Sequence, residues 1–142
     1  NDRFEALMRE AIEQDPNNAT LYFNLGVVIA QRGNKEDASK YYRKTIELDP
    51  KFESGYLNLV TLILQGENDI VEKMNGLGTS RADNARYDEL KLEREQLYSE
   101  CVPILEKLIG FSKNQEAVKT LMNIYGTLGN NEGFMKMKGM IE

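Results

Sequence analysis

The sequence predicts an all-α fold built from antiparallel helical hairpins, and three observations lead to this expectation. A block of residue types recurs at a fixed interval, as in the match of Pro16 with Pro50. Apolar residues keep helical spacing between Gly-Asn and Asp-Pro pairs, which end helices. A longer apolar seam runs through residues 87–111 in alternating steps of 3 and 4 residues. We therefore expect helices throughout the chain and no strand.

The fixed interval indicates an internal repeat, which decides the architecture before any single helix is considered. The segment that ends at Pro16 recurs in the segment that ends at Pro50. Four pairs of residues lie 34 positions apart: Pro16 and Pro50, Tyr22 and Tyr56, Asn24 and Asn58, and Leu25 and Leu59.

One complete unit runs from Ala19 to Phe52. Gly33 and Asn34 end its first helix, and Asp49-Pro50 ends its second. The small residues Gly26 and Ala38 let the two helices approach closely. The unit resembles the tetratricopeptide repeat family, which implies an α-solenoid of stacked hairpins that binds protein or peptide in a concave groove. The resemblance rests on Tyr22, Leu25-Gly26, Ala38, Tyr42 and Pro50.

The repeat divides a single domain, residues 1–142, into four parts. Residues 1–17 are the second helix of a truncated repeat, and 18–51 are the full repeat. Residues 52–113 form a repeat with an elongated hairpin, and 114–142 form the C-terminal repeat. The predicted helices span residues 2–14, 18–32, 35–48, 52–75, 83–111, 115–128 and 131–141, with Asp83 or Asn84 as the cap of the fifth.

The repeat over residues 52–113 breaks the period. Leu59 and its counterpart Leu121 are 62 positions apart, which is 28 more than the 34 of the regular repeat. A structureless loop of that length is unusual in a compact domain, so we expect both helices of the hairpin to be longer. The predicted seam of the second helix comprises Tyr87, Leu90, Arg94, Leu97, Cys101, Ile104, Leu108 and Phe111. Pro103 lies in this pattern and indicates a kink or a new helix start, of which the unbroken seam favours the kink.

The register of the long hairpin gives a specific expectation. If Cys101 lies near Val60, as the family pattern implies, antiparallel helices place Arg94 opposite Glu67. Both apolar seams are interrupted at that level. We therefore predict that Arg94 and Glu67 pair, with space left by Gly66, and that the pair fixes the register.

A narrower resemblance concerns residues 84–109, which look like a tetratricopeptide subgroup common in Bacteroidetes. The segments are residues 87–91, 97–98 and 103–107, and the sequence departs from the subgroup at Ser112-Lys113, where an Asp-Pro pair is usual. Members of that subgroup are often exported, which implies a location in the periplasm or cell envelope of a bacterium, with the cytoplasm as the alternative.

Composition argues against catalysis. The chain has no histidine and a single cysteine, Cys101, so a Cys–His nucleophile and a cysteine metal cluster are both excluded. We expect no catalytic residue, no metal and no cofactor. The formal net charge of −5 and the absence of a basic face argue against nucleic acid as a partner. No apolar run is long enough to insert into a membrane.

The expected function is a non-enzymatic scaffold or adaptor that binds a protein or an extended peptide. Asn24 and Asn58 occupy equivalent positions, and their amides can bind a peptide backbone. The alternative is an architectural protein that self-associates through its helical finger and stack ends. The family pattern predicts these groove residues: Thr20, Phe23, Asn24, Val27, Gln31, Leu57, Asn58, Thr61, Gln65, Lys119 and Asn123.

Overall fold

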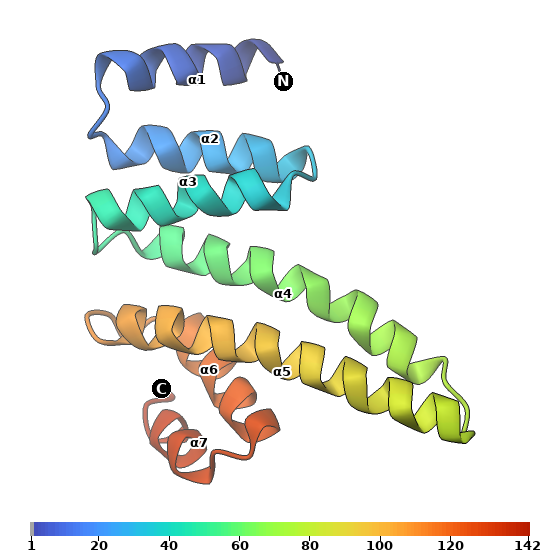
Figure 1. Ribbon diagram of the computed structural model, residues 1–142. Helices are drawn as coiled ribbons and strands as arrows, with labels where there is room; N and C mark the ends of the chain where they lie inside the picture. The colour runs from blue at the N-terminus through green and yellow to red at the C-terminus, as the bar shows by residue number, and fades with distance from the viewer. Residues whose placement is uncertain (1) are drawn as a thin grey trace. The chain divides into compact units, whose positions relative to one another are not determined.

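The computed structural model describes residues 2–142, which form seven α-helices and no strand (Figure 1). The all-α, helical-hairpin fold class is therefore confirmed for this part of the chain. The helices are α1 (Asp2–Gln14), α2 (Ala19–Gln31), α3 (Lys35–Leu48), α4 (Glu53–Asn75), α5 (Arg81–Ile109), α6 (Gln115–Leu128) and α7 (Asn131–Lys138).

Six helix ends lie one to three residues from the predicted positions, and the hydrogen bonds account for two of them. Helix α5 begins two residues early because Ser80, rather than Asp83 or Asn84, is its N-cap, and its hydroxyl accepts from the Asp83 backbone N–H at 3.0 Å. Helix α7 ends at Lys138, three residues early. The Gln115 side chain holds the tail after it, donating to the Met140 carbonyl at 3.2 Å and accepting from the Glu142 N–H at 2.9 Å.

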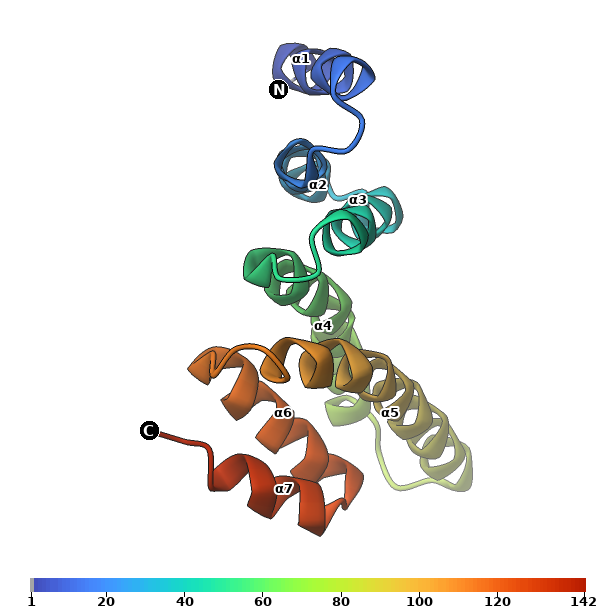
Figure 2. The same cartoon turned by 90° about the vertical axis from the view of Figure 1, so that its left-hand side faces the viewer.

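The chain divides into two compact units, residues 1–62 and 63–142, so α4 contributes its first part to one unit and its remainder to the other. In the first unit, α2 and α3 lie side by side in both views, and α1 packs against α2 (Figure 2). In the second unit, α6 packs against both α5 and α7. Each unit is described separately below.

Helices α2 and α3 approach each other closely at a glycine, Gly26. A Cβ atom on Gly26 would lie 2.8 Å from the ring of Tyr42, so only glycine permits this approach. Ala38 is fully buried at the same interface, and this confirms the predicted role of the two small residues. Thr45, also fully buried, satisfies its hydroxyl by donating to the Tyr41 carbonyl at 2.9 Å.

The repeat period is visible in the hydrogen bonds. The Tyr22 hydroxyl donates to the Pro16 carbonyl at 2.8 Å, and the Tyr56 hydroxyl donates to the Pro50 carbonyl at 2.7 Å. Each tyrosine thereby anchors the loop that precedes its own helix. The repeated tyrosine is thus explained by loop attachment as well as by packing.

The turns of the two short hairpins use the same residue pair. Gly33 and Gly129 have φ values of 85° and 77°, a left-handed conformation that glycine adopts without strain. The asparagine after each glycine caps the next helix: the Asn34 side chain accepts from the Asp37 N–H at 3.1 Å, and Asn130 serves α7 in the same way. The Gly-Asn pairs therefore end one helix and start the next.

Helix α5 continues through Pro103 from Arg81 to Ile109, so the interpretation of Pro103 as a new helix start is wrong. The predicted seam is buried at Leu90, Cys101, Ile104 and Leu108. Its first residue, Tyr87, is 44% exposed and does not belong to it.

Tyr98 and Leu105, which lie outside the predicted seam, are buried as well. A second helix, α6, packs against α5, so α5 buries a wider face than one heptad seam provides.

The predicted pair of Arg94 and Glu67 is confirmed: an Arg94 terminal nitrogen lies 3.4 Å from a Glu67 carboxylate oxygen. Arg94 Nε also donates to the Tyr98 hydroxyl at 3.2 Å, and the guanidinium lies over that ring at 5.3 Å. The expected role of Gly66 is wrong, because the nearest atom to a Cβ there would be a Leu97 methyl group at 3.4 Å, not the guanidinium.

None of the helices formed by residues 2–142 combines the length and apolar character that a membrane span requires.

Candidate peptide-binding site

One face of α2 stays open after the hairpin has formed. Leu25, Val28 and Ile29 turn inward and are buried, whereas Asn24 and Val27 are partly accessible and Gln31 is exposed. The spacing of three and four residues along the helix places the accessible side chains in one row. The Asn18 side chain starts this helix by accepting from the Thr20 N–H at 3.1 Å.

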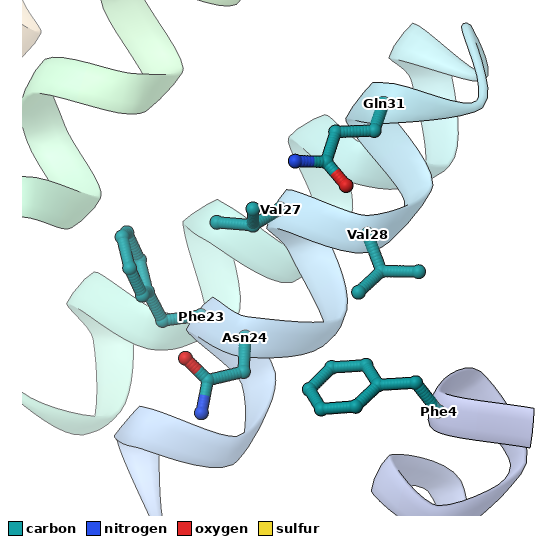
Figure 3. A pocket seen from close by; sticks show the side chains of 6 residues that line it. All are labelled: Phe4, Phe23, Asn24, Val27, Val28 and Gln31. Atoms are coloured by element: carbon teal, nitrogen blue, oxygen red, sulfur yellow. The ribbon is translucent and has the colours of Figure 1, made fainter. Parts of the chain in front are cut away.

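A pocket of about 530 Å³ lies beside this row (Figure 3). Helix α1 supplies one wall through Phe4, and α2 supplies the remainder. In Figure 3 the side chain of Val28 points toward the Phe4 ring, and Phe23 stands on the other side of Asn24. The lining residues are Phe4, Phe23, Asn24, Val27, Val28 and Gln31, none of which carries a charge.

The Phe23 ring, which forms one wall of the pocket, packs against two other aromatic rings. Its ring centroid lies 5.0 Å from that of Phe52 and 5.8 Å from that of Tyr42, both in tilted arrangements. Such aromatic pairs are favourable in offset and edge-to-face geometry. The pocket wall is thus formed before any ligand binds, which reduces the ordering cost of binding.

The equivalent residues Asn24 and Asn58 differ in what they contact. The Asn58 amide donates to the Tyr42 hydroxyl at 3.5 Å. Burial raises the pKa of Tyr42, and the bond from Asn58 partly offsets that rise. Within residues 2–142, no hydrogen-bond partner occupies the Asn24 amide. The residue 34 positions before Tyr42 is Met8, which has no hydroxyl.

Ion pairs fix α1 beside α2. Arg32 bonds to Glu5 at 2.6 Å and to Asp2 at 2.8 Å. Arg9 bonds to Glu5 at 3.1 Å and donates to the Tyr41 hydroxyl at 2.9 Å. The Arg9 bond lowers the pKa of Glu5, and Arg32 lowers it further. The Arg32 contacts therefore tie the start of α1 to the end of α2.

The structure brings four predicted groove residues together at this pocket, namely Phe23, Asn24, Val27 and Gln31. Reasoning from sequence missed Phe4 and Val28. Both were visible as apolar residues at helical spacing, but only the position of α1 shows that they face each other.

The other predicted groove residues are placed as follows. In the first unit, Thr20 and Thr61 are exposed, whereas Leu57 and Asn58 are partly buried. In the second unit, Gln65 and Lys119 are exposed. Asn123 lines a separate pocket of about 210 Å³ with Leu64, Glu67, Tyr98, Thr120 and Ile124.

Cys101 is fully buried, and burial raises the pKa of its thiol to about 12, with smaller contributions from Glu100 and Glu67. A thiol that stays protonated is a poor nucleophile and a poor metal ligand. Among residues 2–142, no cluster of three or more His, Cys, Asp or Glu side chains could hold a metal ion.

Comparison with known proteins identifies the repeat. Residues 19–52, which contain α2 and α3, match the family profile of the tetratricopeptide repeat. The resemblance seen in the sequence is therefore confirmed for that hairpin. A curated relative, the Photosystem I assembly protein Ycf3 of Rippkaea orientalis (strain PCC 8801 / RF-1), is 33% identical over 66 residues, or 45% of this chain. The chain covers 36% of that relative's length.

Two solved structures are also similar. The crystal structure of MamA is 18% identical, with a TM-score of 0.42, over 96% of this chain and 83% of that one. The crystal structure of YrrB, described as a TPR protein with an unusual peptide-binding site, is 15% identical, with a TM-score of 0.40, over 94% and 89%. These scores are too low for any property of either protein to be carried over to this chain.

Proposed function

We propose that this chain is a non-catalytic scaffold that binds a protein or an extended peptide along the open face of α2. The observation that carries this proposal is the pocket between α1 and α2, which gathers four groove residues expected from the family pattern. The tetratricopeptide match over residues 19–52 supports it, because hairpins of this family generally bind proteins or peptides.

Asn24 is the residue best placed to bind a peptide backbone. An amide both donates and accepts, and this one has no partner within residues 2–142. Asn58 was expected to do the same, but it already bonds to Tyr42. We therefore assign the peptide contact to Asn24 and Gln31 and a structural contact to Asn58.

The test uses random peptides displayed on phage and selected against the whole chain. The affinity of a selected peptide is then measured by fluorescence anisotropy for the parent and for Asn24→Ala/Gln31→Ala. Loss of two hydrogen bonds of about 1 kcal/mol each should weaken binding roughly tenfold to thirtyfold. The melting temperature should hardly change.

The matched control is Asn68→Ala/Gln96→Ala, which removes two exposed amides from the other unit. It should bind like the parent. Failure to select any peptide, or equal binding by both double variants, would refute the proposal. A third variant, Met8→Tyr, offers Asn24 a tyrosine hydroxyl like the one that Asn58 contacts. It should also weaken peptide binding.

Self-association is the second candidate function, and the exposed apolar face of α1 favours it. Helix α1 has no buried residue, and Phe4 and Leu7 are 41% and 52% exposed. Light scattering after size-exclusion chromatography tests this at several concentrations. A monomer at all concentrations supports the adaptor, whereas an oligomer that Leu7→Lys dissociates supports assembly.

A location at a bacterial cell envelope is part of the same proposal. It rests on the resemblance of residues 84–109 to the exported subgroup, in which α4 and α5 correspond to the elongated hairpin. Fractionation of cells that produce the whole parent protein tests it, and recovery in the cytoplasmic fraction would contradict it.

A further inference from the structure

The pocket between α1 and α2 has a chemical character that narrows the partner. Its walls are two phenyl rings and two valine side chains, and among the described residues that line it the polar side chains are the amides of Asn24 and Gln31. An apolar side chain that enters is removed from water on several sides, which is favourable in proportion to the area buried. A charged side chain would lose hydration without meeting an opposite charge.

The charged residues beside the pocket also favour an uncharged partner. Glu5 and Arg32, the chain neighbours of Phe4 and Gln31, bond to each other at 2.6 Å, and Arg32 also bonds to Asp2. The side chains that line the pocket carry no charge, and α2 has no charged residue between Ala19 and Gln31. Charge complementarity favours a segment that is uncharged where it meets α2.

The spacing of the amides indicates the partner's conformation. Asn24 and Gln31 are seven residues apart, so the helical rise separates them by about 10 Å along α2. Three residues of an extended chain span about the same distance. Both amides could then bind peptide groups of one extended segment while a side chain between these groups enters the pocket near Val27.

We infer that this pocket selects a bulky uncharged side chain, aliphatic or aromatic, from an extended and locally neutral peptide segment. The inference rests on the proposed function and specifies its ligand. A helical partner would instead place apolar anchors three or four residues apart, which the experiment below distinguishes.

The probe is an array of end-capped heptapeptides in which each position in turn is fixed as Leu, Phe, Ala, Lys or Glu and the other positions are random. Binding of the whole chain should favour Leu or Phe over Lys and Glu by about tenfold or more at one position. Val27→Lys should remove this preference and shift it toward Glu. Leu92→Lys, which places the same charge on a 60% exposed leucine of the other unit, should leave the preference unchanged.

The outcomes separate the two proposals. No binding to any peptide overturns the proposed function and this inference together. Binding without an apolar preference, with a preference that Val27→Lys does not alter, or with anchors spaced three or four residues apart overturns the inference alone. Circular dichroism shows whether Val27→Lys folds; if it does not, the smaller change Val27→Thr should still reduce the preference severalfold.

Discussion

The two helical interfaces that join α2 to α3 and the end of α4 to α5 are held by different forces. In the first, Gly26 admits the Tyr42 ring, and a single added carbon would collide with it at 2.8 Å. In the second, Gly66, the glycine that precedes Glu67, leaves the nearest neighbour of an added Cβ at 3.4 Å, and Arg94 and Glu67 make a contact beside it.

From this difference we predict two ways of fixing the register of antiparallel helices. Interlocking of a ring and a glycine allows one position only, because sliding by one residue would bring a side chain into the ring. At the second interface we expect the contact of Arg94 with Glu67 to fix the register, and such a contact tolerates small shifts better than close packing does. The contact between the end of α4 and α5 is therefore expected to weaken with added salt, and the packing of α2 against α3 to respond to changes in side-chain volume.

The largest expected effect is at alkaline pH and concerns the buried thiol of Cys101 in α5. Burial raises the pKa of Cys101 from 9.0 to about 12, so the folded state keeps a proton that the unfolded state releases. The stabilisation is present below pH 9 and is lost as pH rises toward 12. The parent should lose about 1.4 kcal/mol per pH unit more than Cys101→Ala above pH 9.

Urea unfolding at several pH values between 8 and 11 measures this slope. The comparison of slopes removes the constant cost of the cavity that Cys101→Ala leaves. Equal slopes for the two proteins would show that the thiol is not buried as described.

The next largest effect compares the same substitution at the two interfaces. Gly26→Ala should destabilise by about 1–2 kcal/mol, because overpacking against the buried Tyr42 outweighs the gain in helix propensity. Gly66→Ala should instead stabilise by about 0.5–1 kcal/mol, since an added methyl group fits beside Leu97. Opposite signs in chemical denaturation confirm the comparison; equal signs contradict it.

A smaller effect is expected from removing the hydroxyl group of one tyrosine in each unit, Tyr98 in the second and Tyr42 in the first. Tyr98→Phe takes away the acceptor of Arg94 Nε, 3.2 Å distant, and should destabilise by about 1 kcal/mol. Tyr42→Phe removes only the long bond from Asn58 at 3.5 Å and should have less effect. Thermal unfolding of the two variants measures this order, and the reverse order would show that the Asn58–Tyr42 bond contributes more to stability than the Arg94–Tyr98 bond.

The part of the fold that follows local rules was predictable from sequence. Helix order, the Gly-Asn turns and the pairing of Arg94 with Glu67 follow from periodicity, turn chemistry and the constant register of antiparallel helices. The burial of Tyr98 was not predictable, because it depends on a second helix packed against α5. A sequence pattern shows which residues are apolar, but it does not show how many helices will pack against them.

The candidate site illustrates the same limit. Asn24 and Asn58 are identical in type and in repeat position, and the sequence gives them one role. Their roles differ because the neighbouring helix presents Tyr42 to one of them, whereas the position equivalent to Tyr42 in α1 is Met8. Likewise, Phe4 becomes a pocket wall only because α1 lies against α2, where Arg32 pairs with Asp2 and Glu5.

The smallest expected effect concerns the coupling of Arg94 with Glu67. Both side chains are partly exposed, at 30% and 24%, so solvent screens their attraction and the pair should contribute about 0.5 kcal/mol. A double-mutant cycle with Arg94→Met and Glu67→Gln isolates this coupling, and it should shrink further at high salt. Arg86 and Glu89, an exposed pair at 2.9 Å on one turn of α5, provide the control cycle.

Hydrogen exchange tests whether the register depends on the Arg94–Glu67 pair. If it does, loss of this pair, but not of the control pair, should increase amide hydrogen exchange in the part of α4 after Gly66. The increase should be well beyond what a change of about 0.5 kcal/mol in stability explains. Equal exchange in both cycles would reduce the Arg94–Glu67 contact to an ordinary surface ion pair.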